Sequence, residues 1–271
     1  MTAIPMAAGT RQAASMTAAT TAVAVRLLRK YVRSPQLLVW SVAGGAIFIV
    51  LFRYIFGGSI RFGSLPYVDF LMPGMILTSV LVNGAGTAIG VAEDREQGFF
   101  DRLRSLPMPR SALLAGRVLG DTVIVAFGTA VITAMGFLVG FRLHGTIEEA
   151  LLAFGLCLAC DFAFLWMFVC MGLVAANAQA AQGISMVAYP LIFISSAYVR
   201  VDTLPGWMHA LAAHQPVAVM CNAVRSLALG DPASAGLGHT ITYWVVLSLI
   251  WSAAIAGVFA PLAVALQQRK A

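Results

Sequence analysis

Charged residues are scarce in this sequence. Asp, Glu, Lys and Arg make up 10% of the 271 residues, and the mean hydropathy is +0.88, whereas about a quarter of the residues in a soluble domain are charged. This shortage excludes an ordinary soluble domain and predicts a chain that lies largely in lipid. The net charge of +6 is then better explained by orientation in a membrane than by nucleic-acid binding, so no nucleic-acid partner is expected.

Motifs for nucleotide chemistry are missing as well. The sequence contains no GxxxxGK[ST], and neither lysine, Lys30 or Lys270, follows a glycine-rich loop. The chain is therefore not expected to bind and split ATP in the manner of a P-loop enzyme. If ATP drives its function, the ATPase must be a separate chain.

Histidine and cysteine are too few and too poorly spaced to predict a metal or redox site. His209 and His214 are five residues apart, whereas a helical metal site needs ligands three or four apart. Cys157 and Cys160 form a CxxC, but no second pair accompanies them. Small apolar helix residues are the simpler interpretation of these cysteines, and no metal site is expected.

The N-terminal region divides into two parts. Residues 1–20 are small, polar and aperiodic, and they predict a disordered tail. Residues 21–36 predict an amphipathic helix, in which Val25, Leu28 and Val32 share one face with Leu27 and Tyr31 beside it. The opposite face is basic and consists of Arg26, Arg29, Lys30 and Arg33. Such a helix is suited to an anionic membrane surface, and Pro35 ends it.

Six apolar segments follow, each close to the roughly 20 residues with which a helix crosses the hydrocarbon core. They cover about 37–57, 68–91, 118–141, 150–176, 183–200 and 240–265. Their length and continuity favour helices over barrel strands. The expected fold class is an all-α membrane protein with six transmembrane helices, which form one transmembrane domain over residues 37–268.

The distribution of Arg and Lys predicts the orientation. With the N-terminus in the cytoplasm, twelve of the 17 basic residues lie inside. The five outside are Arg53, Arg61, Arg142, Arg200 and Arg225. This bias follows the positive-inside rule, so both termini and the segment between the second and third spans are predicted to be cytoplasmic.

The connection before the last span has an unusual composition. Residues 202–230 are too apolar for a free outer loop, yet Pro205, Pro216 and Arg225 argue against a full crossing. Two short re-entrant helices that dip into the outer leaflet fit this pattern better. Such segments are tolerated where protein or a cavity covers their backbone.

The densest cluster of charge is EDREQGFFDRLRSLPMPR, residues 93–110. If the second span continues to Gln97, Gly98 makes a natural stop, and a short amphipathic helix would run on toward Pro107. Its apolar face would consist of Phe99, Phe100, Leu103 and Leu106. Exposed aromatics flanked by Arg favour a protein-binding surface. A helix that merely lies on lipid headgroups is the alternative.

Two polar residues lie within predicted spans. Asp161 is about 11 residues from the outer end of its span, hence ~16 Å deep at 1.5 Å per residue. An acid at this depth is functional by default, for example in a proton relay. Because no other clear mid-depth charge accompanies Asp161, a hydrogen-bonding role facing the bundle interior is preferred. Asn83 is interpreted as a polar contact between helices.

Two blocks of this sequence resemble permeases of the ABC-2 type transporter family, especially its daunorubicin/doxorubicin-resistance branch. The run EQGFFDRLRSLPMPRSALLAGRVLGD carries the acidic–Gly–Leu–Pro pattern at Glu96, Gly98, Leu103 and Pro107, although Phe99 stands where Thr is common. The outer block matches at Pro205, Trp207, Pro216, Arg225 and Gly230. The resemblance covers about residues 25–268.

The resemblance implies that the inner segment is a coupling helix, seated in a groove of a separate ATPase. Its residues would be Glu96, Gly98, Phe99, Phe100, Arg102, Leu103, Arg104, Leu106 and Pro107. It further implies a bacterial inner-membrane exporter with two ATPase subunits and a second permease, identical or homologous. ATP and Mg would bind to the ATPase, so no cofactor is expected on this chain.

The resemblance implies export, with an amphipathic drug or a lipid as the cargo. A path through apolar spans with few charges suits such a cargo. Two alternatives remain open. One is a proton-coupled secondary exporter that uses Asp161, and vanadate-sensitive, ATP-dependent transport would exclude it. The other is a membrane scaffold or assembly factor without a transport role, for which vesicles that contain the ATPase would show no movement of cargo.

Overall fold

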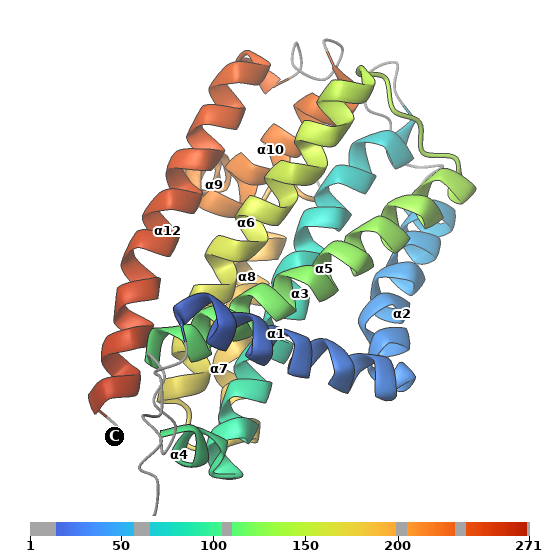
Figure 1. Cartoon of the computed structure of the whole chain (residues 1–271). Helices are drawn as coiled ribbons and strands as arrows, with labels where there is room; N and C mark the ends of the chain where they lie inside the picture. Colours follow the sequence, from blue (N-terminus) through green and yellow to red (C-terminus); the bar gives the residue numbers. More distant parts are fainter. Residues whose placement is uncertain (1–14, 57–65, 105–109, 199–204, 231–236, 270–271) are drawn as a thin grey trace, which may run out of the picture.

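The computed structural model describes residues 15–56, 66–104, 110–198, 205–230 and 237–269, and every element in these ranges is helical (Figure 1). Four helices are long and apolar enough to cross a membrane. They are α3 (Tyr67–Glu96), α5 (Arg110–Val139), α6 (Ile147–Val174) and α12 (Ile241–Arg269). The all-α membrane fold is thereby confirmed, with four clear spans in the described residues where six are predicted.

The first and fifth predicted spans are not long α-helices. α2 (Pro35–Leu51) has 17 residues and continues as a π-helical turn, η1 (Phe52–Phe56). The segment 183–200 is divided, since α7 (Ala178–Ser185) and α8 (Ala188–Phe193) are separated by a turn. Pro190 explains the break, because its ring clashes with the carbonyl four residues earlier in a continuous helix and its nitrogen donates no hydrogen bond.

α1 (Met16–Arg33) begins before the predicted helix start. The side chain of Ser15 accepts a hydrogen bond from Ala18 N at 3.2 Å, and this cap together with the alanine-rich first turns stabilises the helix. The prediction of a disordered tail is therefore wrong for residues 16–20, while residues 1–14 lie outside the described ranges. The helix ends before Pro35, as predicted.

The glycines of α5 let α1 pack closely across it (Figure 1). A Cβ atom at Gly116 would lie 2.6 Å from Thr20 O, and one at Gly120 would lie 2.9 Å from a methyl carbon of Leu27. Val25 and Val32 of the predicted apolar face are exposed and lie outside the contact between α1 and α5. Their expected place on a membrane surface stays a prediction.

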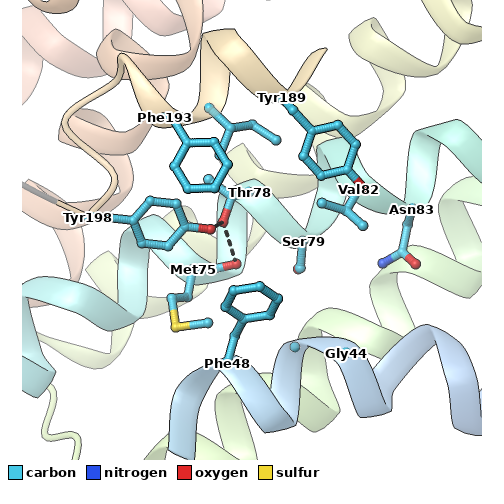
Figure 2. A pocket seen from close by; sticks show the side chains of 12 residues that line it. Gly44, Phe48, Met75, Thr78, Ser79, Val82, Asn83, Tyr189, Phe193 and Tyr198 are labelled. Carbon is cyan, nitrogen blue, oxygen red and sulfur yellow. Dashed lines mark hydrogen bonds between the residues drawn. The ribbon is translucent and has the colours of Figure 1, made fainter. Parts of the chain in front are cut away.

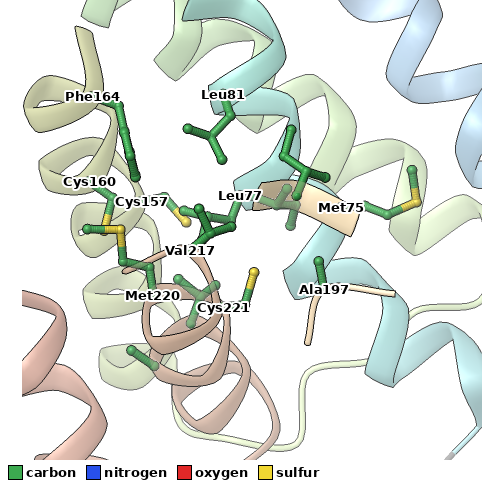
Figure 3. Packing of buried hydrophobic residues seen from close by; sticks show 14 of the residues in the cluster. Met75, Leu77, Leu81, Cys157, Cys160, Phe164, Ala197, Val217, Met220 and Cys221 are labelled. Carbon is green, nitrogen blue, oxygen red and sulfur yellow. The ribbon is translucent and has the colours of Figure 1, made fainter. Parts of the chain in front are cut away.

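The main core lies where α3, α6 and α10 meet (Figure 3). α9 (Gly206–His214) and α10 (Pro216–Leu229) are two short helices in the segment where two were predicted. Residues 217–229 of α10 are all buried, and they pack beside Leu77 and Leu81 of α3 and Phe164 of α6. We call the end of the bundle that contains α10 and the α5–α6 connection the α10 end. The opposite end, which contains α4 (Phe99–Arg104), is the α4 end (Figure 1).

Candidate functional site

α4 follows α3 after one tight turn. Gly98 adopts φ = +65°, a left-handed conformation that glycine reaches without steric cost. Gln97 N donates to Glu93 O, and Gly98 N donates to Arg95 O. The predicted stop at Gly98 and the short helix beyond it are thus confirmed.

Several predicted coupling residues cannot be placed in detail. Leu106 and Pro107 lie outside the described residues, and only the helical backbone of Leu103 and Arg104 is described. Glu96 and Arg102 are both exposed. These two residues therefore mark the part of α4 and its turn that faces away from the bundle.

The two aromatic residues of α4 are half-buried rather than exposed. The guanidinium of Arg26 in α1 lies 3.6 Å from the centroid of the Phe99 ring, a cation–π contact. Phe100 packs against the apolar cluster that contains Val91 and Leu114. The prediction of two exposed aromatics is therefore wrong, because α1, α3 and α5 form a seat for them. The aromatic side of α4 attaches it to the bundle.

Directly behind α4 lies a buried arginine between two carboxylates. Arg117 Nη1 is 3.0 Å from Asp94 Oδ2, and Arg117 Nε is 2.8 Å from Asp121 Oδ2. Thr87 donates its hydroxyl to the same Asp121 oxygen at 2.7 Å. These contacts tie α3 to α5, since Thr87 and Asp94 lie on α3 while Arg117 and Asp121 lie on α5.

α1 adds two cations to this group. Arg26 lies 3.7 Å from Asp94, and Lys30 lies 3.8 Å from Glu93. Burial raises the pKa of Tyr31 on the same helix, with Asp121 and Glu93 adding to the rise and Arg117 opposing it. We call the six charged residues the junction cluster: Arg26, Lys30, Glu93, Asp94, Arg117 and Asp121. Two residues of the predicted basic face, Arg26 and Lys30, thus belong to the junction cluster. The other two, Arg29 and Arg33, are exposed and lie outside it.

The junction cluster was not predicted from the sequence as a unit. One signal was available, since Arg117 and Asp121 are four residues apart in an otherwise apolar helix. At that spacing opposite charges meet on one helix face, and ionisable groups within membrane segments usually pair.

Neighbouring Arg95 donates to Leu173 O at 2.6 Å, so the end of α6 is attached to the same region.

An apolar pocket opens between α2, α3 and α8, with a cavity volume of about 170 Å³ (Figure 2). Aromatic rings form much of its wall: Phe48, Tyr189, Phe193 and Tyr198. Polar groups are few; the hydroxyls of Thr78 and Tyr198 are 2.8 Å apart, and Asn83 also lines the pocket. Apolar walls with a few polar groups are typical of small-molecule sites. No pattern in the sequence indicated this pocket.

The outer motif surrounds a second buried arginine, Arg225 of α10. Arg225 is fully buried, and it donates to Phe70 O at 3.1 Å, Ser196 O at 2.8 Å and Asn222 Oδ1 at 3.1 Å. The Phe70 ring lies 3.9 Å from the guanidinium carbon. No carboxylate within the described ranges pairs with it. Arg225, predicted on the outer side, is thus a core residue that binds α10 to α3 and to the segment after α8.

The other motif residues set helix boundaries. Pro205 precedes α9, and Pro216 occupies the first turn of α10. Backbone N–H groups in the first turn have no partner within the helix, so the N–H that proline lacks costs no hydrogen bond there. Gly230 ends α10 with φ = +68°. Trp207 is 80% exposed at the start of α9. The motif therefore shapes the α9–α10 pair, and Trp207 is available to the surroundings.

Asp161 is fully buried inside the bundle, so its predicted direction is confirmed. Neither carboxyl oxygen meets a hydrogen-bond partner in the described part of the chain. Thr122 of α5 lies beside Asp161, but its hydroxyl donates to Val118 O at 3.0 Å. The predicted hydrogen-bonding role is therefore not realised by any described residue.

Comparison with known proteins agrees with this architecture. Residues 18–229 match the family described as ABC-2 type transporter. The chain is 32% identical over 268 residues to the daunorubicin resistance ABC transporter permease protein DrrB1 of Streptomyces coeruleorubidus, covering 98% of this chain and 92% of that protein. It is 27% identical to the probable doxorubicin resistance permease DrrC of Mycobacterium tuberculosis, covering 83% and 80%. It is 25% identical to the inner membrane transport permease YadH of Escherichia coli, covering 80% and 86%.

Proposed function

The chain belongs to the ABC-2 type transporter family, and on this premise we propose that it is the permease subunit of an ATP-driven exporter. It would move an amphipathic drug or lipid out of the cytoplasm or the inner leaflet. Two separate ATPase subunits would bind ATP and Mg, and a second permease, identical or homologous, would complete the complex. Family and apolar helices make the chain a multi-pass membrane protein and a transport subunit.

The proposed topology has six crossings and both termini in the cytoplasm of a bacterial cell. α2 with η1 would form the first crossing, and the broken pair α7 and α8 would form the fifth. A broken helix is tolerated at membrane depth where protein covers its free backbone groups. α1 would lie at the cytoplasmic surface with α4, and the α9–α10 pair would lie in the outer leaflet.

The observation that carries the proposal is the attachment of α4 to the bundle. Its aromatic side contacts α1 and the cluster with α5, and the exposed Arg102 lies on the same short helix. A partner bound to α4 would therefore be able to move α1, α3 and α5 together, because the junction cluster joins these three helices. ATP binding could shift the permease between two conformations if the ATPase dimer bound them with different affinity.

The cargo would pass the aromatic pocket between α2, α3 and α8. Its walls are apolar, and the hydroxyls of Thr78 and Tyr198 with the Asn83 amide supply a few polar contacts. This mixture suits a flat amphipathic drug or the boundary between a lipid headgroup and its chains. The names of the two drug-resistance relatives favour such a cargo.

A substitution on α4 tests the proposal. Leu103→Asp should abolish co-purification with the cognate ATPase and ATP-dependent uptake of doxorubicin into inverted vesicles, since it places a charge on the predicted docking face. Arg29→Asp is the matched control, because Arg29 is exposed on the polar face of α1 and outside the docking face. ATPase binding and uptake that Leu103→Asp leaves unchanged would refute the coupling role.

One observation favours the proton-coupled alternative. Asp161 is buried with both oxygens unpartnered in the described residues, and such an acid could carry a proton. In that case Asp161→Asn and gradient-dissipating ionophores would both stop transport, and vanadate would not. Under the ATP-driven proposal vanadate stops transport and ionophores do not. A scaffold would give no cargo movement in any of these assays.

A further inference from the structure

A groove runs between α6 and α12 at the α10 end of the bundle. We propose that it binds a lipid whose headgroup carries an ammonium group, with an acyl chain between the helices and the ammonium at Glu148. The groove has a volume of about 720 Å³, within the ~300–1,000 Å³ typical of small-molecule sites. Its walls are almost wholly apolar and include Leu152, Leu156, Val245 and Leu249.

The depth of the groove matches one leaflet. Its lining follows α6 from Glu148 to Ala159, about 16 Å at 1.5 Å per residue. This is about half of the ~30 Å hydrocarbon core. The lining ends at Ala159, and at the next residue Cys160 Sγ lies 3.5 Å from Ser248 Oγ on α12, so the two helices are in contact at this level.

The limited length of the groove decides what kind of occupant fits. Farther along, Cys170 Sγ lies 3.2 Å from Phe259 O, so α6 and α12 stay in contact toward the α4 end. A transmembrane helix of a partner would need an apolar seam along the whole bundle. An acyl chain needs only one leaflet, so the groove fits a lipid.

Glu148 is the single acidic residue among the described residues that line the groove, and it decides the headgroup chemistry. Glu148 lies in the first turn of α6, at the groove's open end. Its neighbour Glu149 is engaged in the helix cap, accepting from Thr146 N at 2.7 Å. A carboxylate at headgroup depth attracts an ammonium group and repels a purely anionic headgroup, by about 1 kcal/mol per charge at a membrane surface.

The groove is separate from the proposed cargo pocket. That pocket is lined by α2, α3 and α8, whereas α12 lies on the side of the bundle opposite α2 (Figure 1). The lipid would therefore be a bound component rather than cargo in transit. The inference requires a membrane-embedded bundle but not export.

Photo-crosslinking in vesicles tests the site on the full chain. Phosphatidylglycerol vesicles would carry traces of phosphatidylethanolamine or phosphatidylglycerol, each with a diazirine on one acyl chain. Phosphatidylethanolamine should label peptides containing residues 151–159 and 241–249 about fivefold more than phosphatidylglycerol, the equivalent of ~1 kcal/mol. Equal labelling by the two lipids would overturn the headgroup assignment.

Two pairs of variants separate headgroup from chain. Glu148→Gln should remove the headgroup preference, while Glu149→Gln should keep it, since glutamine also serves in a capping box. Gly155→Leu should abolish labelling by filling the groove, because no atom lies within 4 Å of a Cβ at Gly155. Gly257→Leu on α12, equally open and outside the lining, should label like wild type.

Both leucine variants improve helix propensity, so loss of the fold would not explain a difference between them. Wild-type labelling of Gly155→Leu, or loss of the preference in Glu149→Gln, would overturn the site. The readout is lipid binding, so a failure here and a failure of ATP-driven export are seen in different assays.

Discussion

The two ends of the bundle each bury an arginine, and they satisfy it in different ways. Arg117 at the α4 end lies between the carboxylates of Asp94 and Asp121. Arg225 at the α10 end donates to the carbonyls of Phe70 and Ser196 and to the amide of Asn222. Charged partners on mobile side chains can be exchanged, whereas backbone carbonyls stay where their helices place them. The comparison indicates an α4 end able to change its pairing and an α10 end that is fixed.

Removing the Arg117 charge should have the largest effect. Arg117→Met leaves the buried Asp121 without its cation and Asp94 with the longer contact to Arg26, and it should cost about 3–5 kcal/mol of unfolding free energy. Adding Asp94→Asn and Asp121→Asn should recover at least half of that loss, because the uncompensated charges are gone. Unfolding in mixed detergent micelles would measure both. If the triple variant is no more stable than Arg117→Met, Arg117 stabilises the bundle through packing rather than through its charge.

Arg225→Met should cost less, about 2–3 kcal/mol, because it leaves neutral acceptors without a donor. Lysine distinguishes the two ends. Arg117→Lys keeps the charge that the carboxylates require and should retain most of the stability. Arg225→Lys should retain little, since a single ammonium group cannot reach acceptors on three segments as the guanidinium fork does. If lysine retains the same share of the stability at both positions, the proposed difference between the two ends of the bundle is wrong.

Arg26→Ala should have a small effect on stability and a larger one on coupling. It removes the contact with the Phe99 ring and a half-exposed ion pair with Asp94, worth together about 1 kcal/mol. If α4 transmits motion through α1, ATPase activity should persist while cargo movement falls severalfold. Arg29→Ala, on an exposed residue of the same helix, is the control and should transport normally.

Lys30→Ala should have the smallest effect. The Lys30–Glu93 pair is 3.8 Å long and about half exposed, and such pairs contribute roughly 0–1 kcal/mol. Raising the salt concentration to 1 M should remove any difference between variant and wild type, since the Debye length is then about 3 Å. The stability of Arg225→Met relative to wild type should not respond to salt. A salt response there would show that an unrecognised charge reaches the α10 end.

The sequence allowed good prediction where backbone chemistry decides the structure. Gly98 ended α3 as expected, and Pro205 and Pro216 correctly indicated two short helices. Predictions of which side chains face protein were poorer, as Phe99 illustrates, since it was expected to be exposed and is half-buried. In a membrane protein both the core and the lipid-facing surface are apolar, so hydropathy does not separate them. The burial of Arg225 was not predicted, because a lone cation is expected at a surface unless its buried partners are known.

The connection between α1 and α2 has a mechanical consequence. α1 ends at Arg33 and α2 begins at Pro35, which leaves Ser34 as the whole linker. A linker of one residue cannot absorb a rotation of one helix relative to the other, so α1 and α2 are expected to move together as one unit. If α1 rocked on Gly116 and Gly120, α2 would swing with it and carry Phe48 toward or away from the opposite wall of the aromatic pocket.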